Sequence, residues 1–208
     1  MRMSVTQLVE DERNDFADFL ETLTAQEWAA QSLCEGWTMR DVVAHVVSYE
    51  GVGPGDLARR FTRGRFMLSR INAESLAQHR EHEPAELVAL LRKHVTPSGL
   101  TSAFGGRIAL LDTLMHHQDI RRVLGTARDV PAERLRVVLP FALVAPPVKA
   151  MWHIRGVRVI ATDIDWSGGA GREARGTGEA VLMVMGGRRS VAGELDGPGA
   201  ERLARRLG

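Results

Sequence analysis

Apolar residues recur at helical spacing through the first half of the chain. Between about residues 4 and 24 they fall three or four positions apart, which is typical of the buried face of an amphipathic helix. A second helix is predicted to begin at Thr38, whose hydroxyl can cap it together with Asp41 three residues later. Four valines make this second helix apolar on most sides, which predicts that it is buried: Val42, Val43, Val46 and Val47.

Three more helical segments complete the first half. One is expected over about 54–80, with a break near Gly64, and another begins at Glu83-Pro84, where proline suits the first helical turn. A longer one is expected over about 104–124, ending at Gly125 after two arginines. Four or five helices with one strongly apolar member indicate a helical bundle.

The second half has a different pattern. A helix is expected from Pro131 to Val144, an alternating strand over 157–162, a glycine turn over 168–171 and a second strand over 173–176. Two further helices are predicted, at 179–185 and after Gly199. The sequence therefore predicts an α+β protein, with a helical domain over 1–128 and a small α/β domain over 129–208.

Composition narrows the range of partners and compartments. The 208 residues carry 27 basic and 26 acidic side chains, a balance that argues against nucleic acid or a membrane surface as partner. A single cysteine, Cys34, excludes an intramolecular disulfide. Neither a signal-peptide core nor an apolar run long enough to cross a membrane is present, so we expect a cytoplasmic protein.

Three side chains form a candidate metal site. Asp112 and His116 are four residues apart, so they share one face of the predicted 104–124 helix. If the buried helix that carries His45 packs against that face, the three side chains converge. A set of two imidazoles and one carboxylate suits Zn²⁺, Ni²⁺ or Fe²⁺, and three protein ligands leave one coordination position open for chemistry.

Simpler interpretations exist for the same residues. His45 could be a satisfied core histidine, and Asp112 could pair with Arg107 or Arg40. His117 must point about 100° away from His116, towards solvent or a neighbour on its own helix.

Three neighbouring residues have secondary roles. Asp119 could accept the second ring N–H of His116, or instead pair with Arg121 or Arg122. Trp37 is interpreted as a packing residue rather than a pocket wall. Cys34 is interpreted as a small buried hydrophobe rather than a nucleophile, since the sequence shows no neighbouring group that would activate its thiol.

Two motifs resemble a known family. The stretch CEGWTMRDVVAH, residues 34–45, resembles the C-x-G-W-[ST]-[VM]-[RK]-D-[VL]-[VL]-A-H signature of the mycothiol-dependent maleylpyruvate isomerase-like family, a member of the DinB-like metal-binding four-helix-bundle superfamily. The stretch DTLMHHQDIRR, residues 112–122, resembles the family's second motif. Segments 155–166 and 195–199 resemble its C-terminal domain.

The resemblance implies a fold, a metal and a thiol. It implies a DinB-like four-helix bundle followed by a small α/β domain, with a divalent metal, usually zinc, bound by His45, Asp112 and His116. It also implies mycothiol, the low-molecular-weight thiol of actinobacteria, as cofactor or co-substrate. This chain has Asp112 where the isomerase has Glu, and Leu33 in place of a frequent proline.

These observations lead to one main functional hypothesis. We expect a metal-dependent, mycothiol-linked transferase or isomerase that acts on a small electrophilic or unsaturated substrate, with Asp119 orienting His116. The alternatives are a metal-dependent hydrolase that uses bound water and a non-enzymatic stress protein that binds a metal or small ligand. The sequence is compatible with a homodimer.

Overall fold

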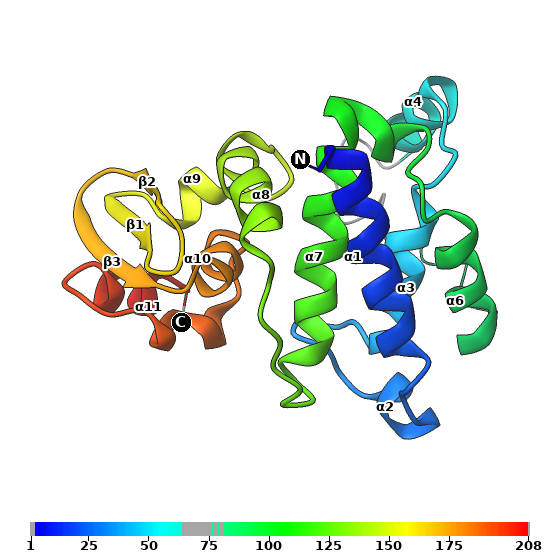
Figure 1. Cartoon of the computed structure of the whole chain (residues 1–208), viewed down its shortest axis with the longest axis horizontal. Helices are drawn as coiled ribbons and strands as arrows, with labels where there is room; N and C mark the ends of the chain where they lie inside the picture. The colour runs from blue at the N-terminus through cyan, green and yellow to red at the C-terminus, as the bar shows by residue number, and fades with distance from the viewer. Residues whose placement is uncertain (1–2, 64–75, 77–78, 80, 208) are drawn as a thin grey trace. The chain divides into compact units, whose positions relative to one another are not determined.

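The chain folds as two compact units, Met1–Ala127 and Arg128–Gly208 (Figure 1). The computed structural model describes residues 3–63, 76, 79 and 81–207. Helices dominate, and one three-stranded sheet lies in the second unit, which confirms the predicted α+β class.

Four helices form the framework of the first unit. Helix α1 (Val5–Leu20) packs against α6 (Pro84–Lys93) and α7 (Arg107–Arg121), and α3 (Met39–Ser48) packs against the same two helices. Shorter elements connect them: α2 (Ala25–Ala29), α4 (Pro54–Arg63) and the 3₁₀ segment η1 (Leu100–Gly106). This arrangement places one face of α3 directly against α7.

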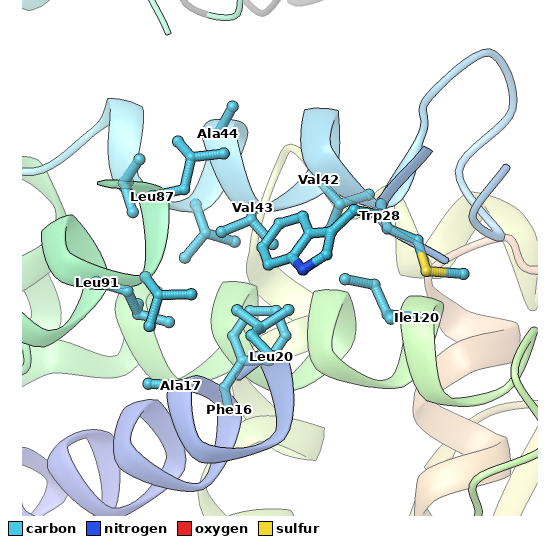
Figure 2. Close-up of a cluster of buried hydrophobic side chains, with 14 of the residues drawn as sticks. Phe16, Ala17, Leu20, Trp28, Val42, Val43, Ala44, Leu87, Leu91 and Ile120 are labelled. Carbon is cyan, nitrogen blue, oxygen red and sulfur yellow. The ribbon is translucent and has the colours of Figure 1, made fainter. Parts of the chain in front are cut away.

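The core of the first unit lies between these helices. Figure 2 shows Phe16 and Leu20 of α1 meeting Val43 of α3, Leu91 of α6 and Ile120 of α7. All five side chains are almost inaccessible to solvent. Burying a side chain of this size contributes about 1.5–3 kcal/mol, so the apolar stripes seen in the sequence hold the bundle together.

The structure corrects the boundaries of two predicted helices. The helix predicted over 4–24 ends at Leu20, and the separate helix α2 follows, started by a Thr24 cap. The helix predicted from 104 begins at Arg107, because residues 103–105 have non-helical backbone angles. The segment predicted over 54–80 is helical to Arg63, and most of its remainder lies outside the described residues.

The second unit is built around one sheet. Its strands are β1 (Val157–Ala161), β2 (Trp166–Gly169) and β3 (Arg172–Gly176), in the order β2-β1-β3. β1 pairs antiparallel with β2 and parallel with β3. The predicted turn over 168–171 is partly wrong, since Gly168 and Gly169 belong to β2. Gly171 is required in the following turn, because a Cβ there would lie 2.3 Å from the Gly156 carbonyl oxygen.

Helix α10 (Gly178–Met185) forms the core of the second unit. It packs against β1, β3, α8 (Ala132–Val144) and α9 (Ala150–His153). The segment η2 (Arg189–Glu194) also contacts it, and α11 (Ala200–Leu207) ends the chain. Thr177 caps α10 by accepting a hydrogen bond from the Ala180 amide. None of the helices in the described part of the chain combines the length and apolarity that a membrane crossing requires.

Candidate metal centre

Helix α3 carries His45 into the interior of the first unit. Thr38 and Asp41 form the predicted capping box: the Asp41 amide donates to the Thr38 hydroxyl at 3.2 Å, and the Thr38 amide donates to the Asp41 carboxylate at 3.0 Å. This cap fixes where the helix begins, and His45 follows two turns later. His45 is only 7% exposed, as the apolar character of the helix predicts.

Helix α7 presents Asp112 and His116 towards His45. The Nε2 atoms of His45 and His116 each lie 3.5 Å from the same oxygen, Oδ1 of Asp112. The three ligand atoms all lie within 4.8 Å of one another. The structure therefore brings together the three side chains that the sequence singled out, and Asp112 pairs with neither Arg107 nor Arg40 among the described contacts.

The spacing of these atoms fits the ligands of one cation. A separation of 3.5 Å is longer than the usual 2.7–3.2 Å of an N–H···O hydrogen bond. Two ligands bound tetrahedrally at about 2.1 Å from a zinc ion would lie about 3.4 Å apart. Both histidine–carboxylate distances match that edge length, so the donor set fits a divalent metal in chemistry and in size.

Asp119 determines which nitrogen of His116 faces the cluster. The Nδ1 atom of His116 lies 2.9 Å from Oδ2 of Asp119, whose side chain is inaccessible to solvent. A carboxylate can only accept, so Nδ1 must carry the proton. The Nε2 lone pair of a neutral His116 then points towards Asp112 and His45, as a metal-binding imidazole requires.

The electrostatics of the cluster favour a positive charge. Burial disfavours the charged form of Asp112, but the imidazoles of His116 and His45 outweigh it and hold the pKa of this carboxyl well below its usual range. Burial would likewise lower the pKa of His116, yet the facing Asp112 carboxylate, helped by Asp119 and Cys34, raises it well above its ordinary value. A proton bound in this cluster supplies positive charge beside Asp112, and a bound metal cation would supply the same kind of charge in its place.

Comparisons with known proteins give one family match and two similar structures. Residues 9–98 match the mycothiol maleylpyruvate isomerase N-terminal domain family. The match lies in the N-terminal part of this chain and shows that this part is similar to that domain family. No curated protein gives a significant sequence match.

Two solved structures resemble the whole chain. One is the mycothiol-dependent maleylpyruvate isomerase in a histidine-to-alanine mutant form, with a TM-score of 0.60 at 16% identity, covering 94% of this chain and 92% of that one. The other is the mycothiol-dependent maleylpyruvate isomerase, with a TM-score of 0.53 at 15% identity over 88% of each chain. At this identity the likeness shows a shared fold.

The family match and the cluster cover different residues. The match over residues 9–98 includes His45 and the loop before α3, whereas Asp112, His116 and Asp119 lie on α7, beyond its end. The assignment of ligands on α7 therefore depends on the geometry of this chain.

Two aromatic rings border the cluster of His45, Asp112 and His116. The Trp37 ring centroid lies 4.9 Å from that of His45 and 6.2 Å from that of His116, and the Tyr49 ring meets His45 edge-on at 5.3 Å. The prediction for Trp37 is incomplete, since this ring packs against both imidazoles and so forms a wall of the cluster. Tyr49 was missed, although it lies only four residues after His45, at the C-cap of α3.

His117 faces the core of the bundle. It is inaccessible to solvent; its Nδ1 atom lies 2.9 Å from a Glu12 carboxylate oxygen, and its Nε2 accepts a hydrogen bond from Arg121 at 2.7 Å. Its ring also stacks on Phe16. The predicted contact with a neighbour on the helix is made by Arg121. The alternative prediction, exposure to solvent, is wrong, because the ring is bonded to Glu12, 105 positions earlier in the sequence.

Cys34 has a polar partner that the sequence did not reveal. Its Sγ donates to Oδ2 of Asp119 at 3.1 Å and lies 3.8 Å from Nδ1 of His116. The interpretation of Cys34 as a small buried hydrophobe is incomplete, because the residue packs against the hydrophobic core but its thiol also bonds to Asp119. Its partner lies 85 positions away, so no local pattern could have indicated the contact.

Proposed function

We propose that this chain is a metal-dependent, mycothiol-linked transferase or isomerase that acts on a small electrophilic or unsaturated substrate. The observation that carries the proposal is the equal 3.5 Å spacing of the two Nε2 atoms from one Asp112 oxygen. The family match of the N-terminal part supports the link to mycothiol. We expect the protein to act in the cytoplasm, where Cys34 and a free thiol partner stay reduced.

The proposed ligands are His45, Asp112 and His116. Two nitrogens and one oxygen favour zinc, with nickel or iron as further candidates, and leave a fourth position open. A metal bound there would supply a thiolate at neutral pH, because a coordinated thiol is deprotonated.

The surrounding residues would serve this chemistry in distinct ways. Asp119 holds the Nδ1 proton of His116 and so keeps the Nε2 lone pair directed at the cluster. Trp37 covers the rings of His45 and His116 and limits the access of water from that side. The side chain of Asp112 is 32% exposed, whereas those of His45 and His116 are 9% and 10% exposed, so Asp112 is the most accessible of the three proposed ligands.

The metal site is tested by elemental analysis of the purified protein. We expect about one equivalent of metal in the wild type and a loss of most of it in His45→Ala and in Asp112→Ala. His94→Ala is the matched control, because His94 lies in the same unit but outside the cluster. Unchanged metal content in both cluster variants would end the proposal.

The role of the thiol is tested with the metal-loaded protein. Mycothiol and the electrophile monochlorobimane should react faster with the wild type than without protein, and His45→Ala should abolish the difference. A rate equal to the uncatalysed reaction would count against a thiol-linked activity. Turnover of simple esters or amides in the absence of thiol would instead identify a hydrolase.

A further inference from the structure

The loop before α3 is fixed by its own hydrogen bonds. The Gln31 side-chain amide donates to the carbonyl oxygens of Cys34 at 2.7 Å and of Trp37 at 2.8 Å. The Ser32 hydroxyl donates to the Trp37 carbonyl and accepts from the Cys34 amide. Gly36, with φ of 77°, allows the chain to reverse between Cys34 and Trp37. The loop therefore holds both side chains in defined places.

The same loop is attached to α7 beside the cluster. The Leu33 amide donates to the Asp119 carbonyl oxygen at 3.2 Å. Oδ2 of Asp119 accepts two hydrogen bonds, from Nδ1 of His116 at 2.9 Å and from Sγ of Cys34 at 3.1 Å. On the other side, the Trp37 ring packs against His116. One short loop thus contacts His116 directly and through Asp119.

We propose that Cys34 is a positioning residue of the metal centre. Its thiol proton holds Oδ2 of Asp119 in place, and that oxygen holds the Nδ1 proton of His116. The Nε2 atom of His116 is thereby directed at Asp112 and His45. This inference rests on the proposed function, since it assigns Cys34 a role at the same centre.

Distances distinguish this role from that of a metal ligand. Cys34, His116 and Asp119 could in principle form a second cation site, because their ligand atoms lie within 4.8 Å of one another. However, the contacts of 2.9 and 3.1 Å to Asp119 are hydrogen-bond distances, unlike the 3.5 Å contacts around Asp112. A metal on Nδ1 of His116 would also have to displace the proton that Asp119 accepts.

The test compares zinc affinities in competition with a chromophoric chelator. Losing a residue that orients a metal ligand typically weakens metal binding 10–100-fold, so we expect about tenfold weaker zinc binding in Cys34→Ala. Cys34→Ser keeps a donor and should stay within about threefold of the wild type, given that a hydroxyl can replace the thiol as donor. Equal zinc affinity in Cys34→Ala and the wild type would overturn the inference.

A matched control separates positioning from general damage. Thr113 is a buried polar residue on α7 that accepts a hydrogen bond from Arg13 away from the cluster. Thr113→Val should lower the thermal stability of the metal-free protein yet leave zinc affinity within about twofold, because none of the ligands is touched. A loss of affinity in Thr113→Val as large as in Cys34→Ala would show that Cys34 acts only through stability.

Two further measurements complete the test. With Co²⁺ bound, an intense near-ultraviolet sulfur-to-cobalt band that disappears in Cys34→Ser would make Cys34 a ligand and overturn the inference. If the wild type binds no metal, the proposed function fails, but the contact is still measurable by NMR in the metal-free protein. There the Nδ1 proton of His116 should exchange with water severalfold faster in Cys34→Ala than in the wild type, and equal rates would refute the role.

Discussion

Helices α7 and α10 are both deeply buried, but they bury different chemistry. α10 contributes five consecutive side chains with no measurable exposure, all of them apolar: Val181, Leu182, Met183, Val184 and Met185. α7 buries polar side chains as well: Thr113, His116, His117, Gln118 and Asp119. A buried polar group costs free energy unless it is paired, so each of these side chains on α7 requires a partner.

The partners on α7 fall into two networks on different sides of the helix. Towards α1, His117 bonds to Glu12 and Arg121, and Thr113 bonds to Arg13, which pairs with Glu50. The two contacts of His117 are 2.9 and 2.7 Å long, which is ordinary for hydrogen bonds, whereas that of Thr113 is 3.4 Å. Towards α3, the contacts of Asp112 are stretched to 3.5 Å. We interpret the network facing the core as one that stabilises the fold, and the contacts of Asp112 with two imidazoles as those that fit the proposed cation.

The largest expected effect comes from breaking the core network. His117 bonds to Glu12 through one ring nitrogen and to Arg121 through the other, so Glu12→Ala removes the carboxylate from this buried network. Removing one member of a buried ionic network costs about 3–5 kcal/mol of stability. Urea unfolding of the N-terminal unit should show that loss. Glu12→Gln, which still accepts from His117, is expected to lose clearly less. Equal losses would mean that charge is unimportant there.

The apolar helix should respond through packing alone. Leu182→Ala in α10 should destabilise the C-terminal unit by about 3 kcal/mol, a typical cost of a large-to-small change in a core. Zinc binding by the N-terminal unit should not change. Val144→Ala, at a side chain that is 72% exposed, is the control and should stay within about 0.5 kcal/mol. A change of zinc affinity in Leu182→Ala would contradict the separation of roles.

The network facing α3 should respond mainly in metal affinity. Asp119→Ala removes the acceptor for the Nδ1 proton of His116 and should weaken zinc binding about 10–100-fold, equivalent to about 1.4–2.7 kcal/mol. Asp119→Asn retains an acceptor oxygen and should lose less. The exposed carboxylate variant Asp11→Ala should bind zinc as the wild type does. Isothermal titration at fixed pH would measure all three, and a wild-type affinity in Asp119→Ala would refute the role of Asp119.

The smallest expected effect concerns the helix cap. Thr38→Ala removes the acceptor for the Asp41 amide, which should cost about 1 kcal/mol of stability. Thr38→Ser, which can cap equally well, should restore it. Thermal unfolding of the two variants would measure the difference. Complete loss of metal binding in Thr38→Ala would contradict this expectation, because it would mean that the cap, and not the packing of α3 against α6 and α7, holds the helix in place.

Local patterns predicted the parts of this protein that depend on local interactions. The capping box placed the start of α3, and the spacing of Asp112 and His116 placed both on one face of α7. The alternating residues from Val157 predicted β1. In each case the physical cause lies within a few residues of sequence, where capping bonds and helical or strand periodicity operate.

Other features depend on partners far along the chain. Strand β2 has the sequence WSGG, which lacks the alternation of a strand, and it forms because β1 supplies a ladder. The bonds from Cys34 to Asp119 and from Glu12 to His117 join residues 85 and 105 positions apart. Sequence periodicity contains no information about such pairs, which is why the environments of Cys34 and His117 were misjudged.

The adjacency of His116 and His117 has a consequence for how the proposed metal centre could be rebuilt elsewhere. Successive residues on a helix are rotated by about 100° about its axis, so the bond from His117 to Glu12 helps to fix the angular orientation of α7. That rotation in turn decides where His116 points. Grafting Asp112 and His116 onto another scaffold would therefore require a rotational anchor on the opposite face of the host helix, and not only a copy of the ligands.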